Sequence, residues 1–202
     1  MNSSSVKIKN LPLLIDTVVI PGVKGQIGLT SCPGMKDEYS CFDDYGDSMT
    51  DDLLTIRNWG ATALVTLLDE SELLVLGVKE LPRKASALNI LWIHLPILNL
   101  SIPDKKFDIQ WAWAGPRLGQ WLREGQRIVI HCKEGIGRAG LVAARLMIEL
   151  GTPPEQAINS VQKARPGSLQ LYSHEKYCYS LAFDRQAACP EAWQQSDGTC
   201  LK

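Results

Sequence analysis

The sequence predicts an α/β domain in which helices flank a central, largely parallel sheet and a cluster of helices follows at the C-terminal end. Short β-branched or apolar runs alternate with helical stretches through the middle of the chain, as strand–helix–strand units require. After the last such run, three helical stretches follow one another without a strand between them. Hydrophobic residues make up 45% of the chain, which is enough to bury a sizeable core.

The predicted strands are short apolar or β-branched runs bounded by glycine, proline or charged residues. They cover residues 17–20, 26–30, 62–68, 90–94 and 127–131. The Pro21-Gly22 pair between the first two runs predicts a turn.

The predicted helices are stretches with helical periodicity and recognisable ends. They cover residues 48–59, 71–81, 83–88, 104–124, 137–150, 152–164 and 169–185. Pro116 is expected to interrupt or bend the fourth of these helices. Thr152 and Glu155 have the spacing of a capping box at the start of the sixth.

The predicted domain organisation is an N-terminal arm with the first strand at 1–24, one domain at 25–187 and a polar tail at 188–202. No run of about 18 apolar residues predicts a membrane span. Lys7 and Lys9 are not followed by the apolar segment of a signal peptide. We therefore expect a cytoplasmic monomer without a membrane anchor.

Charge and cysteine usage exclude several classes of function. The chain has 21 Lys and Arg against 22 Asp and Glu, which does not favour a nucleic-acid-binding protein. Its six cysteines are widely spaced and form no C-x-x-C pair, so neither a disulfide scaffold nor a zinc site is expected. We expect no metal and no cofactor.

The loop after the strand at 127–131 is the strongest candidate site. It runs His131-Cys132-Lys133-Glu134-Gly135-Ile136-Gly137-Arg138 and leads into a helix. A free thiol ionises only in part at neutral pH, and a position just before a helix start stabilises the thiolate. Cys132 is therefore the candidate nucleophile.

The remaining residues of this loop suit an anion. Gly135 and Gly137 allow backbone N–H groups to turn inward and bind a phosphate, and Arg138 can grip its oxygens with two N–H groups. His131 is expected to orient the loop by hydrogen bonding. The plainer interpretation is a buried cysteine beside an ordinary glycine turn.

The pattern His131-Cys132-x-x-Gly135-x-x-Arg138 resembles the signature of the protein-tyrosine phosphatase superfamily. Over residues 25–185 the chain resembles, more narrowly, the cyclin-dependent kinase inhibitor 3 (kinase-associated phosphatase) group of dual-specificity phosphatases. The similar segments are the following: Leu29-Thr30-Ser31-Cys32-Pro33-Gly34, His94-Leu95-Pro96-Ile97 and Pro154-Glu155-Gln156-Ala157-Ile158.

This resemblance implies a cysteine-phosphatase fold and a two-step reaction through a phosphocysteine, without a metal. It implies a phosphorylated protein or peptide as substrate: phosphotyrosine, with phosphoserine and phosphothreonine left open. Lys133, Glu134, Gly135, Ile136, Gly137 and Arg138 would bind the phosphate. Lys133 also resembles the phosphoinositide phosphatases, but Glu134 would repel a polyanionic headgroup.

Three positions depart from the family pattern. The family's acid aligns with Asn99, which cannot donate a proton as an acid, so Asp104 is the preferred substitute and Asp108 the second. Asp104 can equally be a helix cap.

Ala139 replaces a hydroxyl residue, which predicts slow breakdown of the phosphocysteine. Gln170 matches the first of two water-positioning glutamines, whereas His174 replaces the second. A phosphate-recognition module with little turnover is therefore the alternative function.

Overall fold

The computed structural model describes residues 13–35 and 48–187, with side chains described as far as residue 182. The strands are as follows: β1 Asp16–Val19, β2 Gln26–Thr30, β3 Ala61–Thr66, β4 Leu91–His94 and β5 Arg127–His131. The helices are as follows: α1 Ser48–Asn58, α2 Glu70–Val75, α3 Leu81–Ala87, α4 Lys105–Arg123, α5 Arg138–Glu149, α6 Pro154–Ala164 and α7 Tyr172–Ala187.

The strands form one sheet in the order β1-β2-β5-β3-β4. Only β1 runs antiparallel, paired with β2 in a hairpin, and the other described pairs are parallel. The predicted α/β class with a largely parallel sheet is thus confirmed. The first strand, predicted within the N-terminal arm, belongs to the same sheet as the rest of the domain.

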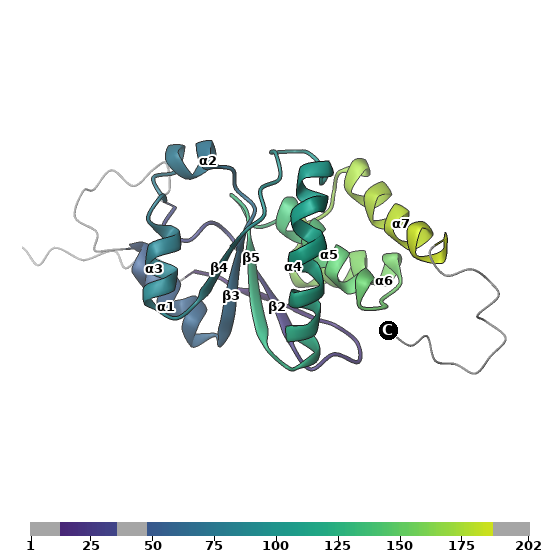
Figure 1. The fold of residues 1–202 in the computed structure, drawn as a ribbon, viewed down its shortest axis with the longest axis horizontal. Coiled ribbons are helices and arrows are strands. Elements are labelled where there is room, and N and C mark those ends of the chain that lie inside the picture. Colours follow the sequence, from purple (N-terminus) through teal and green to yellow (C-terminus); the bar gives the residue numbers. More distant parts are fainter. Residues whose placement is uncertain (1–12, 36–47, 188–202) are drawn as a thin grey trace, which may run out of the picture.

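Helices cover both faces of the sheet (Figure 1). On one side, α1 and α3 pack on a core that includes Leu53, Ile56, Leu64 and Leu81. On the other side, α4 to α7 form the larger layer, whose core extends from the sheet into α5 and α6. Helix α5 lies at the centre of this layer, because eleven of its residues, from Arg138 to Ile148, are buried.

Two expectations for the helices are wrong: an interruption at Pro116 and a capping box at Thr152. Helix α4 continues through Pro116 without interruption, because its buried apolar side chains pack along its whole length and outweigh the cost of a proline. Helix α6 begins at Pro154, after an extended Pro153 with ψ 144° and no side-chain cap. A residue that precedes proline avoids the helical region, so Thr152 lies too early to form a capping box.

The parallel strands place their carboxyl ends at one edge of the sheet, where α/β proteins form their sites. β5 and β3 end beside each other at His131 and Thr66. The chain after β3 stays at this edge, because the Leu67 N–H donates to the His131 carbonyl at 3.1 Å. Across residues 13–35 and 48–187, no helix is long and apolar enough to cross a membrane.

Candidate active site

The loop 132–137 joins the end of β5 to the start of α5, and we call it the phosphate loop. Two hydrogen bonds hold its backbone. The Cys32 N–H donates to the Lys133 carbonyl at 3.0 Å, and the Arg165 guanidinium donates to the Glu134 carbonyl at 2.8 Å. Gly135 has a φ of 74°, and a Cβ at this position would lie 2.2 Å from the Thr30 carbonyl oxygen. Glycine is therefore required there.

Arg165 also pairs with Asp16 of β1 at 2.5 Å. Its side chain is 15% exposed, so this pair is partly shielded from water. The guanidinium connects the first strand, the end of α6 and the phosphate loop. No local sequence pattern predicts Arg165 as a site residue, because an arginine that follows a helix is unremarkable along the chain.

Cys132 lies at the entrance of the phosphate loop, and its side chain is a free, buried thiol with 4% exposure. Arg138 is the charged group beside it. Burial opposes the charge of Arg138, but hydrogen bonds to Glu72 and the proximity of the Cys132 sulfur outweigh burial and raise its pKa. The guanidinium therefore stays charged next to the sulfur, as the predicted chemistry requires.

Cys32 is a second buried thiol, and it lies close enough to Cys132 for the two sulfurs to interact electrostatically. Burial, with a contribution from Cys132, raises the pKa of Cys32 to about 12. Its Sγ interacts with the Pro33 carbonyl at 3.7 Å. Cys32 is therefore protonated at neutral pH and its backbone supports the phosphate loop.

Glu72 holds the Arg138 side chain in place. Its carboxylate accepts two hydrogen bonds from the guanidinium, at 2.6 Å from Nη1 and 2.8 Å from Nη2. Nη1 also donates to the Ile97 carbonyl at 2.8 Å. Arg138 is only 3% exposed, so these contacts fix a rigid, planar donor group.

The sequence contains one local sign of Glu72, a capping box. Asp69 and Glu72 form a capping box at the start of α2: the Asp69 side chain accepts from the Glu72 N–H, and Glu72 accepts from the Asp69 N–H. This spacing predicts a helix start and nothing more. The contact with Arg138, 66 residues away, depends on the sheet.

A chain of hydrogen bonds from β4 and β3 holds His131, which in turn orients the phosphate loop. The Trp92 indole N–H donates to Thr66 Oγ1 at 2.8 Å, and this oxygen lies 2.7 Å from His131 Nε2. Because an indole only donates, Thr66 is free to donate its own proton to Nε2. The imidazole proton is then on Nδ1, which lies 3.2 Å from the Cys132 carbonyl oxygen.

His131 is fully buried, and burial lowers its pKa to about 4. Arg138 and His94 lower the pKa further, whereas the hydrogen bond to the Cys132 carbonyl raises it. The imidazole is therefore neutral at physiological pH. It can position the phosphate loop without carrying a proton in the reaction.

The candidate acids lie apart from this network. Asp104 is the N-cap of α4, where its Oδ1 accepts from the Phe107 N–H at 2.8 Å. The cap predicted as its alternative role is thus present. Asp108 pairs with Arg145 at 2.7 Å. Asn99 lies in a turn closed by the Ser101 N–H and the Leu98 carbonyl at 3.1 Å.

The positions after the phosphate loop are placed as follows. Ala139 is fully buried in the first turn of α5. Gln170 is exposed just before α7. His174 is 1% exposed, and its Cε1 would lie 3.7 Å from a Cβ on Gly137. Burial lowers the pKa of His174, so a neutral ring packs against the loop.

The exposed part of the loop is formed by Lys133 and Glu134, which are 46% and 58% exposed. Their side chains lie 3.9 Å apart, which is a weak surface ion pair. Ile136 is half-buried. The loop thus presents one lysine, partly balanced by a glutamate, beside the buried arginine.

Comparison with known proteins gives concordant matches. A family model described as "Polymorphic toxin system, DSP-PTPase phosphatase" matches residues 42–152. Cyclin-dependent kinase inhibitor 3 of Rattus norvegicus is 30% identical over 166 residues, which cover 80% of this chain and 74% of that protein. The Homo sapiens protein of the same name is 29% identical over 165 residues, with the same coverage of both chains.

Solved structures agree with these relatives. The crystal structure of kinase associated phosphatase, with its catalytic cysteine replaced by serine, superposes with a TM-score of 0.75 and 25% identity. It covers 90% of this chain and 99% of its own. PTPMT1 in complex with PI(5)P shares the fold, with a TM-score of 0.60, 16% identity and coverage of 80% and 93%.

Proposed function

Because the chain belongs to the DSP-PTPase phosphatase family, we propose that it is a cysteine-dependent phosphatase that removes phosphate from phosphotyrosine in proteins. Phosphoserine and phosphothreonine are further substrates in this proposal. The observation that supports it best is the charged Arg138, fixed by Glu72, beside the Cys132 sulfur at the end of β5.

In the proposed first step, the Cys132 sulfur attacks phosphorus and the bond from phosphorus to the substrate oxygen breaks. The leaving oxygen takes a proton from an acid, which we assign to Asp104. In the second step, water attacks phosphorus and the sulfur–phosphorus bond breaks. The electron pair returns to sulfur, and the water proton goes to the same carboxylate.

Asp104 also caps α4 through the hydrogen bond from the Phe107 N–H, so a test must distinguish the cap from the acid. Asp104→Asn separates the two roles, because asparagine caps a helix as well as aspartate does. If Asp104 is the acid, this variant hydrolyses an ester with a poor leaving group much more slowly, and an activated ester only slightly more slowly. Equal slowing of both esters removes Asp104 from the mechanism.

A phosphate-recognition module with little turnover is the second candidate function. Asn99 at the position of the family's acid and Ala139 at the position of its hydroxyl residue favour it. In this function, Cys132 and Arg138 bind a phosphorylated partner without completing the reaction.

A burst assay with an aryl phosphate tests both functions. Steady release of phosphate that disappears in Cys132→Ser supports the phosphatase. A stoichiometric burst without turnover indicates a trapped phosphocysteine. No release, together with retained binding of a phosphopeptide, supports the recognition module and contradicts the proposed hydrolysis.

Phosphoinositide hydrolysis is the remaining alternative, and Lys133 is the residue that favours it. Glu134 lies 3.9 Å from the Lys133 amine and adds a negative charge next to any polyphosphorylated headgroup. Comparing kcat/KM for a phosphotyrosine peptide and a soluble phosphoinositide distinguishes the two. A higher value for the phosphoinositide would contradict the protein substrate.

A further inference from the structure

A cavity of about 450 Å³ lies between the segment 97–104 and the start of α7. Its size is within the range of sites that bind small ligands. Its lining residues come mostly from one loop and are mainly aliphatic: Ile97, Leu98, Leu100, Ser101, Ile102, Pro103, Asp104 and Ser173. We call it the flanking cavity.

One wall of the flanking cavity contacts Arg138, and the other is continuous in the chain with a residue near the phosphate loop. On one side, the Ile97 carbonyl accepts a hydrogen bond from Arg138 at 2.8 Å. On the other side, Ser173 precedes His174, whose ring packs near Gly137. A substrate whose phosphate lies over Cys132 would therefore place its neighbouring groups in or beside this cavity.

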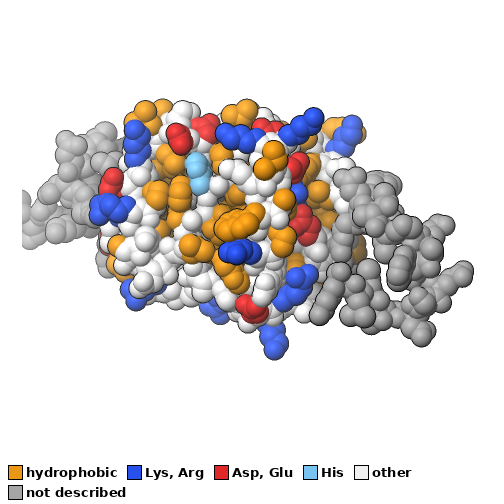
Figure 2. All heavy atoms as spheres, viewed as in Figure 1, with side chains coloured by type: hydrophobic (Ala, Val, Ile, Leu, Met, Phe, Trp, Pro, Cys, Tyr) orange, Lys and Arg blue, Asp and Glu red, His pale blue; other side chains and the backbone are white. Residues whose placement is uncertain are grey.

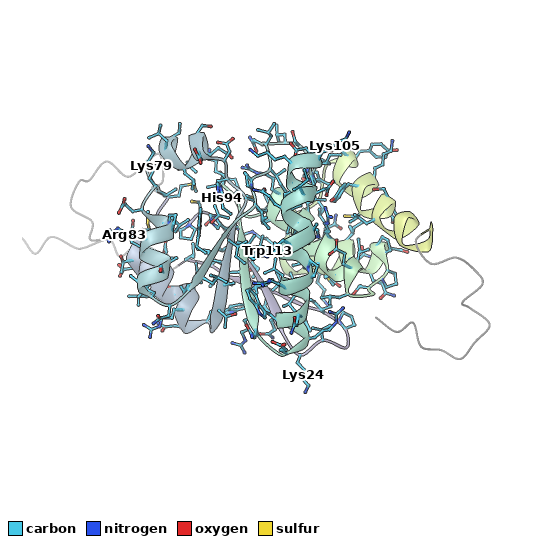
Figure 3. All side chains as sticks on the ribbon, viewed as in Figure 1. Lys24, Lys79, Arg83, His94, Lys105 and Trp113 are labelled. Carbon is cyan, nitrogen blue, oxygen red and sulfur yellow. The ribbon has the colours of Figure 1, made fainter. Side chains whose placement is uncertain are left out.

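The cavity exposes apolar side chains to water. Leu98, Leu100 and Ile102 are 63%, 74% and 41% exposed, and Tyr172 nearby is 79% exposed. In Figure 1 this segment runs along the upper edge of the molecule to the start of α4, and Figure 2 shows apolar side chains along that edge together with basic and acidic ones. Lys105, labelled in Figure 3, marks its end at the start of α4.

Both the backbone conformation and the solvent exposure of Leu100 are unfavourable for folding. Its φ is 58°, a left-handed conformation that suits glycine or asparagine rather than leucine. Its side chain is also exposed. Strained backbone that carries an exposed apolar side chain is a sign of a binding surface rather than of folding.

The cavity has the chemistry of a peptide site. Among the described residues that line it, Asp104 carries the one charge, and its carboxylate caps α4. The N–H groups of Leu98, Leu100 and Ile102 have no hydrogen-bond acceptor within residues 13–35 and 48–187. A peptide supplies both an aliphatic side chain and carbonyl acceptors for these donors, whereas a lipid acyl chain supplies no acceptor.

We propose that the flanking cavity binds an aliphatic side chain next to the phosphorylated residue of a protein substrate, and that the N–H groups of Leu98, Leu100 and Ile102 bind its peptide carbonyls. This inference rests on the proposed function and narrows its substrate class to phosphorylated sites with aliphatic neighbours.

The test compares two phosphotyrosine peptides that differ only in the residues on both sides of the phosphotyrosine: leucine in one and glycine in the other. The expected ratio of kcat/KM is about 10 in favour of leucine, the usual effect of one apolar contact. Leu100→Asn keeps the turn, because asparagine tolerates a positive φ, and should reduce the ratio to about 2. Val75→Asn, at another exposed apolar residue on α2, is the matched control and should keep the ratio.

Binding to Cys132→Ser separates failure of this inference from failure of the proposed function. If wild-type protein hydrolyses neither peptide, but Cys132→Ser binds the leucine peptide more tightly and Leu100→Asn removes that difference, the cavity is supported and the hydrolysis is not. Equal binding and equal kcat/KM for the two peptides overturn the cavity. It is also overturned if Leu100→Asn instead impairs hydrolysis of a phosphorylated lipid in vesicles, because an acyl chain is then the occupant.

Discussion

Helix α5 carries two buried arginines about two turns apart, and they differ in what surrounds them. Arg138 contacts the Glu72 carboxylate, two backbone carbonyls and the Cys132 sulfur. Arg145 pairs with Asp108 at 2.7 Å and with Glu149 at 2.9 Å, and it donates to the Tyr177 hydroxyl. The partners of Arg138 come from α2 and from loops at the sheet edge, whereas those of Arg145 come from α4, α5 and α7.

Burial and charge alone do not distinguish these arginines. In both, burial opposes the charge, but hydrogen bonds to carboxylates outweigh it and raise the pKa. The rings of Trp111 and Phe107 lie 4.8 and 5.6 Å from the Arg145 guanidinium. Arg145 is therefore enclosed by aromatic rings and joins three helices, whereas Arg138 faces the Cys132 sulfur.

The largest expected difference is in catalysis. Arg138→Lys should lower kcat on an aryl phosphate by about 100-fold or more, because an ammonium cannot present the fork of donors that a phosphate requires. Arg145→Lys should change kcat by less than about threefold. Steady-state kinetics of both variants tests the contrast, and an equal loss in the two would remove the special role of Arg138.

Acid should destabilise the folded protein through His131, the last residue of β5 before the phosphate loop. The pKa of His131 is about 4 when folded, against an ordinary value of 6.5, so the unfolded chain binds more protons between these values. The free energy of unfolding should be highest above pH 6.5 and fall as the pH decreases toward 4, by at most about 3 kcal/mol. Urea unfolding of wild type and His131→Gln at several pH values measures this. A variant with the same pH dependence as wild type would show that other groups cause it.

Loss of Arg145 should affect the stability of the fold rather than catalysis. Arg145→Met removes hydrogen bonds to two carboxylates and should lower the free energy of unfolding by about 1–3 kcal/mol. The lower part of this range applies if Asp108, which is 52% exposed, becomes solvated. Thermal or urea unfolding gives the value. Unchanged stability with a large loss of kcat would reverse the assignment of the two arginines.

The smallest expected effect comes from changing the glutamates that pair with the two arginines, Glu72 and Glu149. Glu72→Gln leaves one amide oxygen where two carboxylate oxygens accepted from Arg138, and it should lower kcat/KM about tenfold. Glu149→Gln makes the same chemical change beside Arg145 and is the matched control, with kcat/KM expected near the wild-type value. Similar losses in both variants would contradict a positioning role specific to Glu72.

Local patterns in the sequence identified the elements that carry the site. The predicted strands at 26–30 and 127–131 have the bounds of β2 and β5, because strand periodicity and flanking glycines act over a few residues. The local pattern also singled out Gly135, whose backbone takes a positive φ and approaches Thr30 closely. The capping box expected at Thr152 is absent because a proline follows that residue. The interruption expected at Pro116 is absent because the packing of α4 outweighs the cost of a proline.

By itself, the amino-acid sequence determined the strand–loop–helix unit that places Cys132 ahead of Arg138. Only the tertiary structure decided that Glu72 holds Arg138, that Arg165 holds the loop, that Thr66 and Trp92 orient His131, and that residues 97–104 form a cavity beside them. The reason is the strand order: β5 lies between β2 and β3, so residues far apart along the chain meet at one sheet edge. No short-range pattern encodes such meetings.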